Sequence, residues 1–121
     1  MSLDETRIVG SGPQETGTAQ PPRAALVVVH SPDEASKGQR FPLGAEDVTL
    51  GREEGNTIVV ASDQASRRHA RIFASGGAHV LVDLDSTNGT FLTSKLVKEQ
   101  TLRHGDVVRI ATTVLKYVVE G

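Results

Sequence analysis

Three short polar stretches contain side chains suited to holding an anion. Each stretch begins or ends at an apolar segment: Arg52 follows "TLG", the run "SRRH" precedes "ARIFA", and "DSTNG" follows "HVLVDL". Guanidinium forks and hydroxyl groups donate hydrogen bonds to phosphate oxygens and carboxylates. Taken one at a time, such residues are also ordinary in turns, where Ser, Asn and Gly satisfy or relax the local backbone. The chemistry therefore depends on whether the fold brings the three stretches together.

The stretch "DLDSTNGTFL" is open to four interpretations: a plain hairpin turn, a calcium loop, a glycosylation site or the rim of a binding pocket. An EF-hand loop is excluded by its order, which places Thr87 fifth, Asn88 sixth and Ser94 twelfth. The tripeptide "NGT" fits the glycosylation pattern, but nothing in the chain indicates secretion. A hairpin explains Asn88 and Gly89, because both tolerate positive φ, and leaves Ser86 and Thr87 unexplained.

Short apolar segments separated by turn signals predict the elements that must position these residues. No window sustains a helical repeat, and in "AHVLVDL" alternate residues fall on opposite faces, as in a strand. Many short strands favour an all-β domain, a sandwich or a barrel. Residues 1–22 are rich in Gly, Pro, Thr, Gln and acidic residues, and we expect a flexible tail there, followed by one domain over residues 23–121. The expected strands are "AALVVVH", "RFPLG", "DVTLG", "NTIVV", "RHARIFA", "AHVLVDL", "GTFL", "DVVRIA" and "TVLKYVVEG".

Composition excludes several classes of function. The 121-residue chain has no cysteine, so it has no disulfide, thiolate nucleophile or Cys-based zinc site. Its formal net charge is −2, so no global positive field attracts nucleic acid. The longest apolar run is too short to span a bilayer, and no signal peptide is visible. We expect a cytoplasmic protein without membrane insertion, metal or cofactor.

Considered in order along the chain, the motifs resemble those of the forkhead-associated (FHA) domain. They are Gly51-Arg52, Ser66-x-x-His69, Asn88-Gly89 and the tail "LRHGDVVRI", and the resemblance covers roughly residues 24–119. It implies a β-sandwich of two antiparallel-type sheets with binding loops at one end. It also implies a module that binds phosphothreonine in partner proteins and catalyses nothing.

The resemblance assigns roles residue by residue. The residues implied to bind the phosphothreonine or its peptide are Arg52, Ser66, Arg67, Thr87 and Asn88. Those implied to support the binding loops are Gly51, His69 and Gly89. One position departs from the pattern, because some members have a basic residue two positions before the serine and here that residue is Gln64. Arg68 is an uncertain substitute, since the pleat of the strand can direct its side chain away.

Two other functions compete with this interpretation. A hydrolase would use Ser66 and His69 with Asp83 or Asp85 as a triad, but the G-x-S-x-G elbow is missing. A nucleic-acid-binding β domain would use the basic patch at Arg67 and Arg68, but the chain has only three Phe, one Tyr and no Trp for base stacking. We expect neither an enzyme nor a nucleic-acid partner.

The tail contains a candidate phosphorylation site at Thr6, in "DETRIV". FHA domains commonly read an aliphatic or acidic residue three positions after the phosphothreonine, and Val9 occupies that position here. The segment around Thr6 thus resembles a ligand attached to its own receptor, and the alternative is that Thr6 is one of several threonines in a disordered tail. The resemblance also implies a bacterial signalling module that binds a phosphothreonine-containing protein, with a Ser/Thr kinase upstream.

Overall fold

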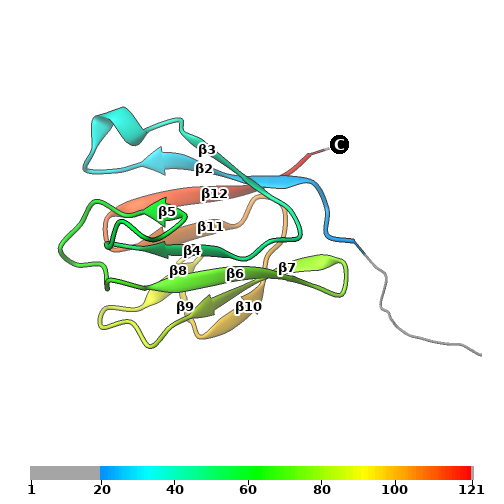
Figure 1. Cartoon of the computed structure of the whole chain (residues 1–121). Coiled ribbons are helices and arrows are strands. Elements are labelled where there is room, and N and C mark those ends of the chain that lie inside the picture. Colours follow the sequence, from blue (N-terminus) through cyan, green and yellow to red (C-terminus); the bar gives the residue numbers. More distant parts are fainter. Residues whose placement is uncertain (1–19, 121) are drawn as a thin grey trace, which may run out of the picture.

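The computed structural model describes residues 20–120, which form two β-sheets packed face to face (Figure 1). Thr6 and most of the predicted tail lie outside these residues, so the tail and the domain boundary stay predictions. The elements are β2 (Ala24–His30), a 3-10 turn (Glu34–Ser36), β3 (Arg40–Leu43), β4 (Val48–Gly51), β5 (Ile58–Val59), β6 (Ala70–Ser75), β7 (Ala78–Asp83), β8 (Thr90–Leu92), β9 (Lys95–Val97), β10 (Glu99–Thr101), β11 (Val107–Ile110) and β12 (Thr113–Val119).

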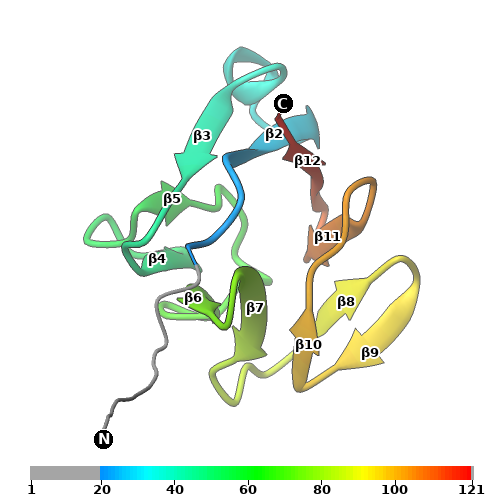
Figure 2. The ribbon, with the colours of Figure 1, turned by 90° about the vertical axis from the view of Figure 1, so that its right-hand side faces the viewer.

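The five-stranded sheet has the order β10-β7-β6-β4-β5, and the six-stranded sheet has the order β3-β2-β12-β11-β8-β9 (Figure 2). Neighbouring strands are antiparallel except for β4 and β5, which pair in parallel. The predicted β-sandwich of antiparallel-type sheets is therefore confirmed, with one parallel pair at an edge. In residues 20–120 no helix has the length and apolar character needed to cross a membrane.

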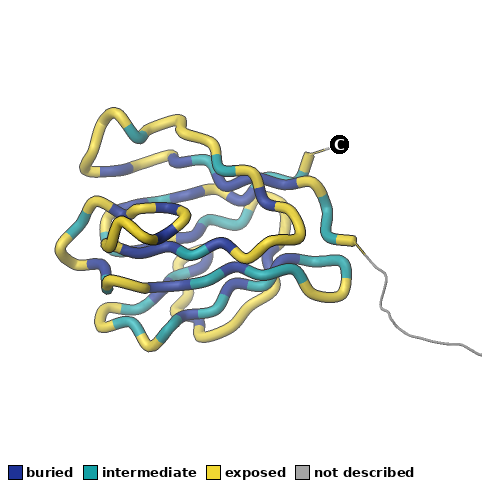
Figure 3. The backbone as a smooth tube through the Cα atoms, in the orientation of Figure 1, coloured by how far each residue is buried: buried dark blue, intermediate teal, exposed yellow. Residues whose placement is uncertain are grey.

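The core lies between the sheets and consists mainly of alternate, inward-facing residues along the strands (Figure 3). Leu50 and Ile72 from one sheet are fully buried with Leu26, Ile110 and Leu115 from the other. Burial of apolar side chains of this size stabilises the fold by about 1.5–3 kcal/mol each. The rigid sandwich provides the frame from which the polar loops project.

Strand β7 has a partly polar inward face. His79, Leu81 and Asp83 point into the molecule, whereas Val80 and Val82 are only partly buried. The buried imidazole of His79 is satisfied on both sides, because its Nδ1 lies 2.8 Å from the Tyr117 hydroxyl and its Nε2 lies 2.9 Å from the Gly44 carbonyl oxygen. Buried polar groups are tolerated when they are paired in this way.

Two strands, β9 and β10, were not among the predicted segments. Each has three residues, each lies at the edge of a sheet, and together they contain Lys95, Glu99 and Gln100. Short, charged edge strands bury little apolar surface and show no strong alternation, so their pattern resembles a loop. Their pairing with β8 and β7 is a result of tertiary structure.

The polar stretches lie on three loops, which gather at one end of the sandwich, at the left in Figure 1. We call them the β4–β5 loop (residues 52–57), the β5–β6 loop (residues 60–69) and the β7–β8 loop (residues 84–89). The segment that leads into β2, blue in Figure 1, enters the domain at the opposite end. The expectation that the loops cluster at one end is confirmed.

Candidate functional site

Arg52 is fixed at the start of the β4–β5 loop through its backbone and part of its side chain. Its backbone N–H donates to the Ser66 carbonyl oxygen at 3.0 Å, and its Nε donates to the Ala65 carbonyl oxygen at 3.1 Å. The terminal guanidinium nitrogens have no hydrogen bond to any residue in the range 20–120, and the side chain is exposed. The fork is thus oriented but retains donors for a ligand.

Gly51 allows the β4–β5 and β5–β6 loops to touch. A Cβ atom at Gly51 would lie 2.2 Å from the Arg67 carbonyl oxygen, which is too close for any side chain. The same carbonyl oxygen accepts hydrogen bonds from the Glu53 N–H and from Nδ2 of the buried Asn56. These contacts hold the two loops in one arrangement.

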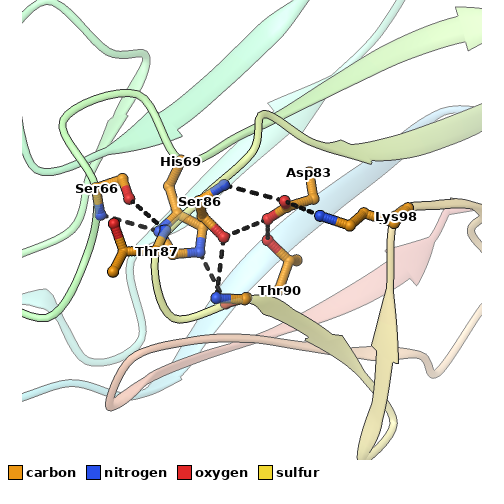
Figure 4. Close-up of polar contacts among 8 residues, drawn as sticks. Ser66, His69, Asp83, Ser86, Thr87, Thr90 and Lys98 are labelled. Carbon is orange, nitrogen blue, oxygen red and sulfur yellow. Dashed lines mark hydrogen bonds and ion pairs between the residues drawn. The ribbon is translucent and has the colours of Figure 1, made fainter.

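His69 joins the β5–β6 loop to the β7–β8 loop (Figure 4). The side chain is completely buried. Its Nδ1 accepts a hydrogen bond from the Ser66 backbone N–H at 3.0 Å, so the proton of the neutral ring lies on Nε2, which donates to the Gly89 carbonyl oxygen at 2.8 Å. Both ring nitrogens are therefore occupied by backbone groups of the two loops, and the ring does not reach the surface.

A second bond between these loops runs through Ser66. The Thr87 backbone N–H donates to Ser66 Oγ at 3.1 Å, which leaves the Ser66 hydroxyl proton available to donate elsewhere. The Thr87 side chain is exposed beside it. Asn88 adds a third bond, from its Nδ2 to the Gln64 carbonyl oxygen at 2.7 Å. Ser66, Thr87 and Asn88 are thus brought together across about twenty residues of sequence.

Gly89 closes the β7–β8 loop with a φ of +91°, a conformation that L side chains rarely adopt. A Cβ atom at this position would also lie 2.6 Å from Leu96 Cδ1 on strand β9. The loop therefore packs against β9.

Arg67 is a predicted site residue, and Arg68 is the uncertain substitute beside it. Both are exposed, and their guanidinium groups make no hydrogen bond or ion pair with any residue between 20 and 120. The backbone of Arg67 is fixed by the contacts described above, but its side chain makes no hydrogen bond to Ser66 or Arg52. The number of cations that reach one ligand therefore stays a prediction.

The Asp83 side chain holds the β7–β8 loop in place through hydrogen bonds. Its buried carboxylate accepts hydrogen bonds from the Ser86 backbone N–H at 3.1 Å, from the Ser86 hydroxyl, and from Thr90 Oγ1 at 2.7 Å, and Lys98 Nζ lies 3.5 Å away (Figure 4). Ser86 Oγ in turn accepts the Gly89 N–H at 3.0 Å. Burial raises the pKa of Asp83, but the hydrogen bonds from Ser86 and Thr90 and the charge of Lys98 outweigh it, so its pKa lies below the ordinary value of 3.8.

This lowered pKa predicts a pH-dependent contribution to stability. Because the folded pKa is below the unfolded one, the ionised carboxylate stabilises the domain above about pH 4, and the contribution is lost as pH falls through the folded pKa. We expect Asp83→Asn to lower the free energy of unfolding by about 2 kcal/mol at pH 7 and by less near pH 3. The exposed neighbour Asp85 provides the control, Asp85→Asn. Denaturant melts that show the same loss for Asp83→Asn at both pH values would contradict this.

Comparison with known proteins identifies the family that has this arrangement. The family model described as the FHA domain matches residues 48–111, a range that contains the described Gly51, Arg52, Ser66, His69 and Asn88. The chain belongs to the FHA domain family.

Relatives of this FHA domain occur in actinobacteria. It is 40% identical over 83 residues to the FHA domain-containing protein FhaB of Mycolicibacterium smegmatis, a match that covers 68% of this chain and 54% of that protein. It is 35% identical over 110 residues to the oxoglutarate dehydrogenase inhibitor of Corynebacterium efficiens, covering 89% and 75% of the two chains. The chain thus spans about half the length of FhaB.

Solved structures with the same fold include an FHA domain described in terms of phosphothreonine-dependent interactions. It has a TM-score of 0.72 and 28% identity to this FHA domain, and the match covers 82% of this chain and 98% of that one. Mycobacterium tuberculosis EmbR, solved with a low-affinity phosphopeptide, has a TM-score of 0.72 and is 31% identical. The match covers 88% of this chain and 27% of the EmbR chain. The nucleic-acid alternative finds no support among these relatives.

The hydrolase alternative requires a hydrogen-bonded relay that this FHA domain does not form. The contact between Ser66 and His69 is made by the serine backbone N–H rather than by its hydroxyl. The other ring nitrogen of His69 faces the Gly89 carbonyl oxygen, and Asp83 bonds Ser86, Thr90 and Lys98 instead. A nucleophile, a base and an orienting acid are therefore not aligned.

Residue patterns alone missed Asp83, Ser86 and Asn56 as supports of the site. Asp83 and Ser86 lie three residues apart just before a turn, a spacing at which a side chain commonly bonds the local backbone, and this signal was available in the sequence. Asn56 is different, because one of its two partners is the distant Arg67 carbonyl oxygen. No side-chain pattern shows such a partner before the loops are placed.

Proposed function

We propose that this FHA domain binds phosphothreonine-containing proteins in Ser/Thr kinase signalling and does so without catalysis. The main observation in its favour is that Arg52, Ser66 and Thr87 lie on loops that hydrogen bonds join to one another at one end of the sandwich. The fork of Arg52 and the hydroxyl proton of Ser66 supply donors for one anion. Asn88, on the same loop as Thr87, would hold the backbone of the ligand.

The chemistry of phosphothreonine matches this set of donors. A phosphothreonine has a charge of about −1.5 to −2 at pH 7 and three acceptor oxygens. Arg pairs with phosphate through parallel hydrogen bonds, and charge-assisted bonds of this kind are worth about 1.5–3 kcal/mol each. Because the loops are already tied together, little ordering is required on binding, which favours affinity. Relatives described by phosphothreonine-dependent binding and by a bound phosphopeptide support the proposal.

Calorimetry with three versions of one peptide tests the proposal. We expect a phosphothreonine peptide to bind with micromolar affinity and the unphosphorylated version to show no binding. The phosphoserine version lacks one methyl group, whose burial contributes about 0.8 kcal/mol, so it should bind roughly fourfold more weakly. Equal affinity for the phosphothreonine and phosphoserine peptides would show that the site does not bury the threonine methyl group. Equal affinity for the unphosphorylated peptide would overturn the proposed function.

We further propose that Thr6, when phosphorylated by a cytoplasmic kinase, is a ligand for the same site. The chain enters the domain at the end opposite the binding loops, and the linker from Gly10 to Arg23 spans about 46 Å when fully extended. A compact domain of about 100 residues has a radius of gyration near 13 Å, so this reach permits self-binding, and pairing between two copies requires no extension. A tethered ligand at millimolar effective concentration would exclude partners.

The Thr6 proposal predicts that enzymatic phosphorylation of the full chain lowers its affinity for an external phosphothreonine peptide at least tenfold. NMR shifts around Arg52, Ser66 and Asn88 should change at the same time. Thr16→Ala and Thr18→Ala are controls that leave the effect in place, whereas Thr6→Ala removes it. Sedimentation separates self-binding from pairing, since only pairing changes the mass. If phosphorylation leaves the peptide affinity, the NMR shifts and the mass unchanged, both self-binding and pairing are contradicted.

A further inference from the structure

The pair Asn88-Gly89 has a chemical reactivity that its proposed role in ligand binding does not use. Asparagine is chemically labile, because the backbone nitrogen of the next residue can attack its side-chain amide. The attack is least hindered when that nitrogen belongs to glycine, which has no side chain. Asn88 is exposed, whereas the other asparagine of the chain, Asn56, is buried and precedes Thr57. Asn88 is therefore the position most prone to deamidation.

Deamidation of this pair requires no reagent other than water. The Gly89 nitrogen loses its proton to solvent and bonds to Asn88 Cγ, and the bond from Cγ to Nδ2 breaks, so that Nδ2 leaves as ammonia and a cyclic succinimide forms. Water then opens the ring at either carbonyl carbon and gives aspartate or isoaspartate. Overall, water is consumed and ammonia is released, with no oxidation or reduction.

Hydrogen bonds restrain both reacting groups in the folded domain. The Gly89 N–H donates to Ser86 Oγ at 3.0 Å, and Ser86 Oγ is fixed in turn by the Asp83 carboxylate (Figure 4). Asn88 Nδ2 donates to the Gln64 carbonyl oxygen at 2.7 Å. Both bonds must break before the Gly89 nitrogen can bond to Asn88 Cγ and Nδ2 can leave. Together they should slow the reaction roughly tenfold.

We propose that Asn88 is a modification site, at which spontaneous deamidation ends phosphothreonine binding. Only the effect on binding rests on the proposed function, because the reaction itself involves no ligand. An aspartate here has no N–H to donate, so its carboxylate and the Gln64 carbonyl oxygen, both acceptors, would face each other. Its negative charge would also lie on the loop that contains Thr87, where it would repel the phosphate.

Isoaspartate would disturb the loop further, because it adds a carbon atom to the main chain. The backbone is fixed on both sides of Asn88. The Thr87 N–H donates to Ser66 Oγ at 3.1 Å, and the Gly89 carbonyl oxygen accepts from His69 Nε2 at 2.8 Å. A longer main chain cannot keep both bonds in this geometry, so both products should have lost affinity for the ligand.

The first experiment measures the rate of deamidation in the full chain at mildly alkaline pH. Mass spectrometry detects the reaction as a gain of about one dalton, and peptide mapping assigns it to a residue. We expect conversion at Asn88 and none at the buried Asn56. The rate should be roughly tenfold below that of a free peptide covering residues 84–92, which lacks the restraining bonds.

Two variants test whether the bond to Ser86 sets this rate. Ser86→Ala removes the acceptor of the Gly89 N–H, so the rate should rise toward that of the free peptide. The matched control is Thr90→Val, which removes another hydrogen bond to Asp83 and leaves the one between Ser86 and Gly89 in place. Its rate should stay near that of the wild type. Equal acceleration in both variants would contradict control by this bond.

The second experiment measures the affinity of Asn88→Asp and Asn88→Ala for a phosphothreonine peptide by calorimetry. Both variants lack the amide donor, and only Asn88→Asp adds a negative charge, so it should bind about tenfold more weakly than Asn88→Ala. In aged wild-type protein, the fraction that no longer binds should equal the fraction deamidated.

The outcomes separate the inference from the proposed function. If Asn88 is unconverted after many half-times of the free peptide, the inference is wrong. It is also wrong if deamidated protein and Asn88→Asp bind the peptide like fresh wild type. Both results leave the proposed function standing. A fresh wild-type domain that binds no phosphothreonine peptide overturns the proposed function and the loss of binding inferred from it, whereas the expected deamidation rates do not change.

Discussion

Arg52→Ala should weaken binding of a phosphothreonine peptide at least tenfold, with the domain still folded. The terminal nitrogens of Arg52 have no hydrogen bond within residues 20–120, so their donors are available to phosphate, and each charge-assisted bond contributes about 1.5–3 kcal/mol. Calorimetry measures the loss directly. Arg52→Lys retains the charge but not the fork, and we expect an intermediate affinity, because a single ammonium cannot form two parallel bonds.

The control for Arg52 must separate charge from position. Arg103 is also exposed but lies on the loop between β10 and β11, so Arg103→Ala removes the same formal charge without touching the three binding loops. It should change affinity by less than about twofold at physiological salt, where exposed charges are screened. Because Arg52 Nε also bonds the Ala65 carbonyl oxygen, thermal melts must accompany the binding data. An Arg52→Ala domain that is folded and binds like wild type would remove Arg52 from the site.

His69→Ala should lower the free energy of unfolding by about 3 kcal/mol. The substitution opens a cavity at a fully buried position and leaves two backbone groups, the Ser66 N–H and the Gly89 carbonyl oxygen, without their partners. For a domain of this size the melting temperature should fall by roughly 10–20 °C. Peptide affinity should fall as well, but through disorder of the loops. His30→Ala, at an exposed histidine, is the matched control and should have little effect.

Ser66→Ala and Asn88→Ala provide the contrast with His69. Ser66 is partly buried and Asn88 is exposed, and each side chain makes one hydrogen bond between the loops, against two for the fully buried His69. Their removal should therefore reduce peptide affinity with a smaller fall in melting temperature than His69→Ala. If His69→Ala melts like wild type but binds no peptide, His69 contacts the ligand and its assignment as a support is wrong. Wild type, His69→Ala, Ser66→Ala and Asn88→Ala should each be measured by thermal melting and by calorimetry. The two measurements together separate residues that mainly support the loops from residues that bind the ligand.

Local sequence patterns were enough to predict the fold class and the order of the motifs. Alternating apolar residues predict strands because a pleated backbone directs successive side chains to opposite faces, and all nine predicted segments contain observed strands. The ordered motifs around Arg52, Ser66 and Asn88 were sufficient to indicate the FHA family, since the side chains that meet a ligand are encoded directly as residue types.

Tertiary structure decided which face of β7 is buried and which backbone atoms hold the loops. By hydrophobicity alone Val80 and Val82 are better core residues than His79 and Asp83. The inward pair is satisfied by partners on other strands, Tyr117 of β12 for His79 and Thr90 of β8 for Asp83. The supports of the site follow the same rule. His69 bonds a backbone N–H and a carbonyl oxygen, and every residue except proline has both groups, so no residue type identifies the partner before the loops are folded together.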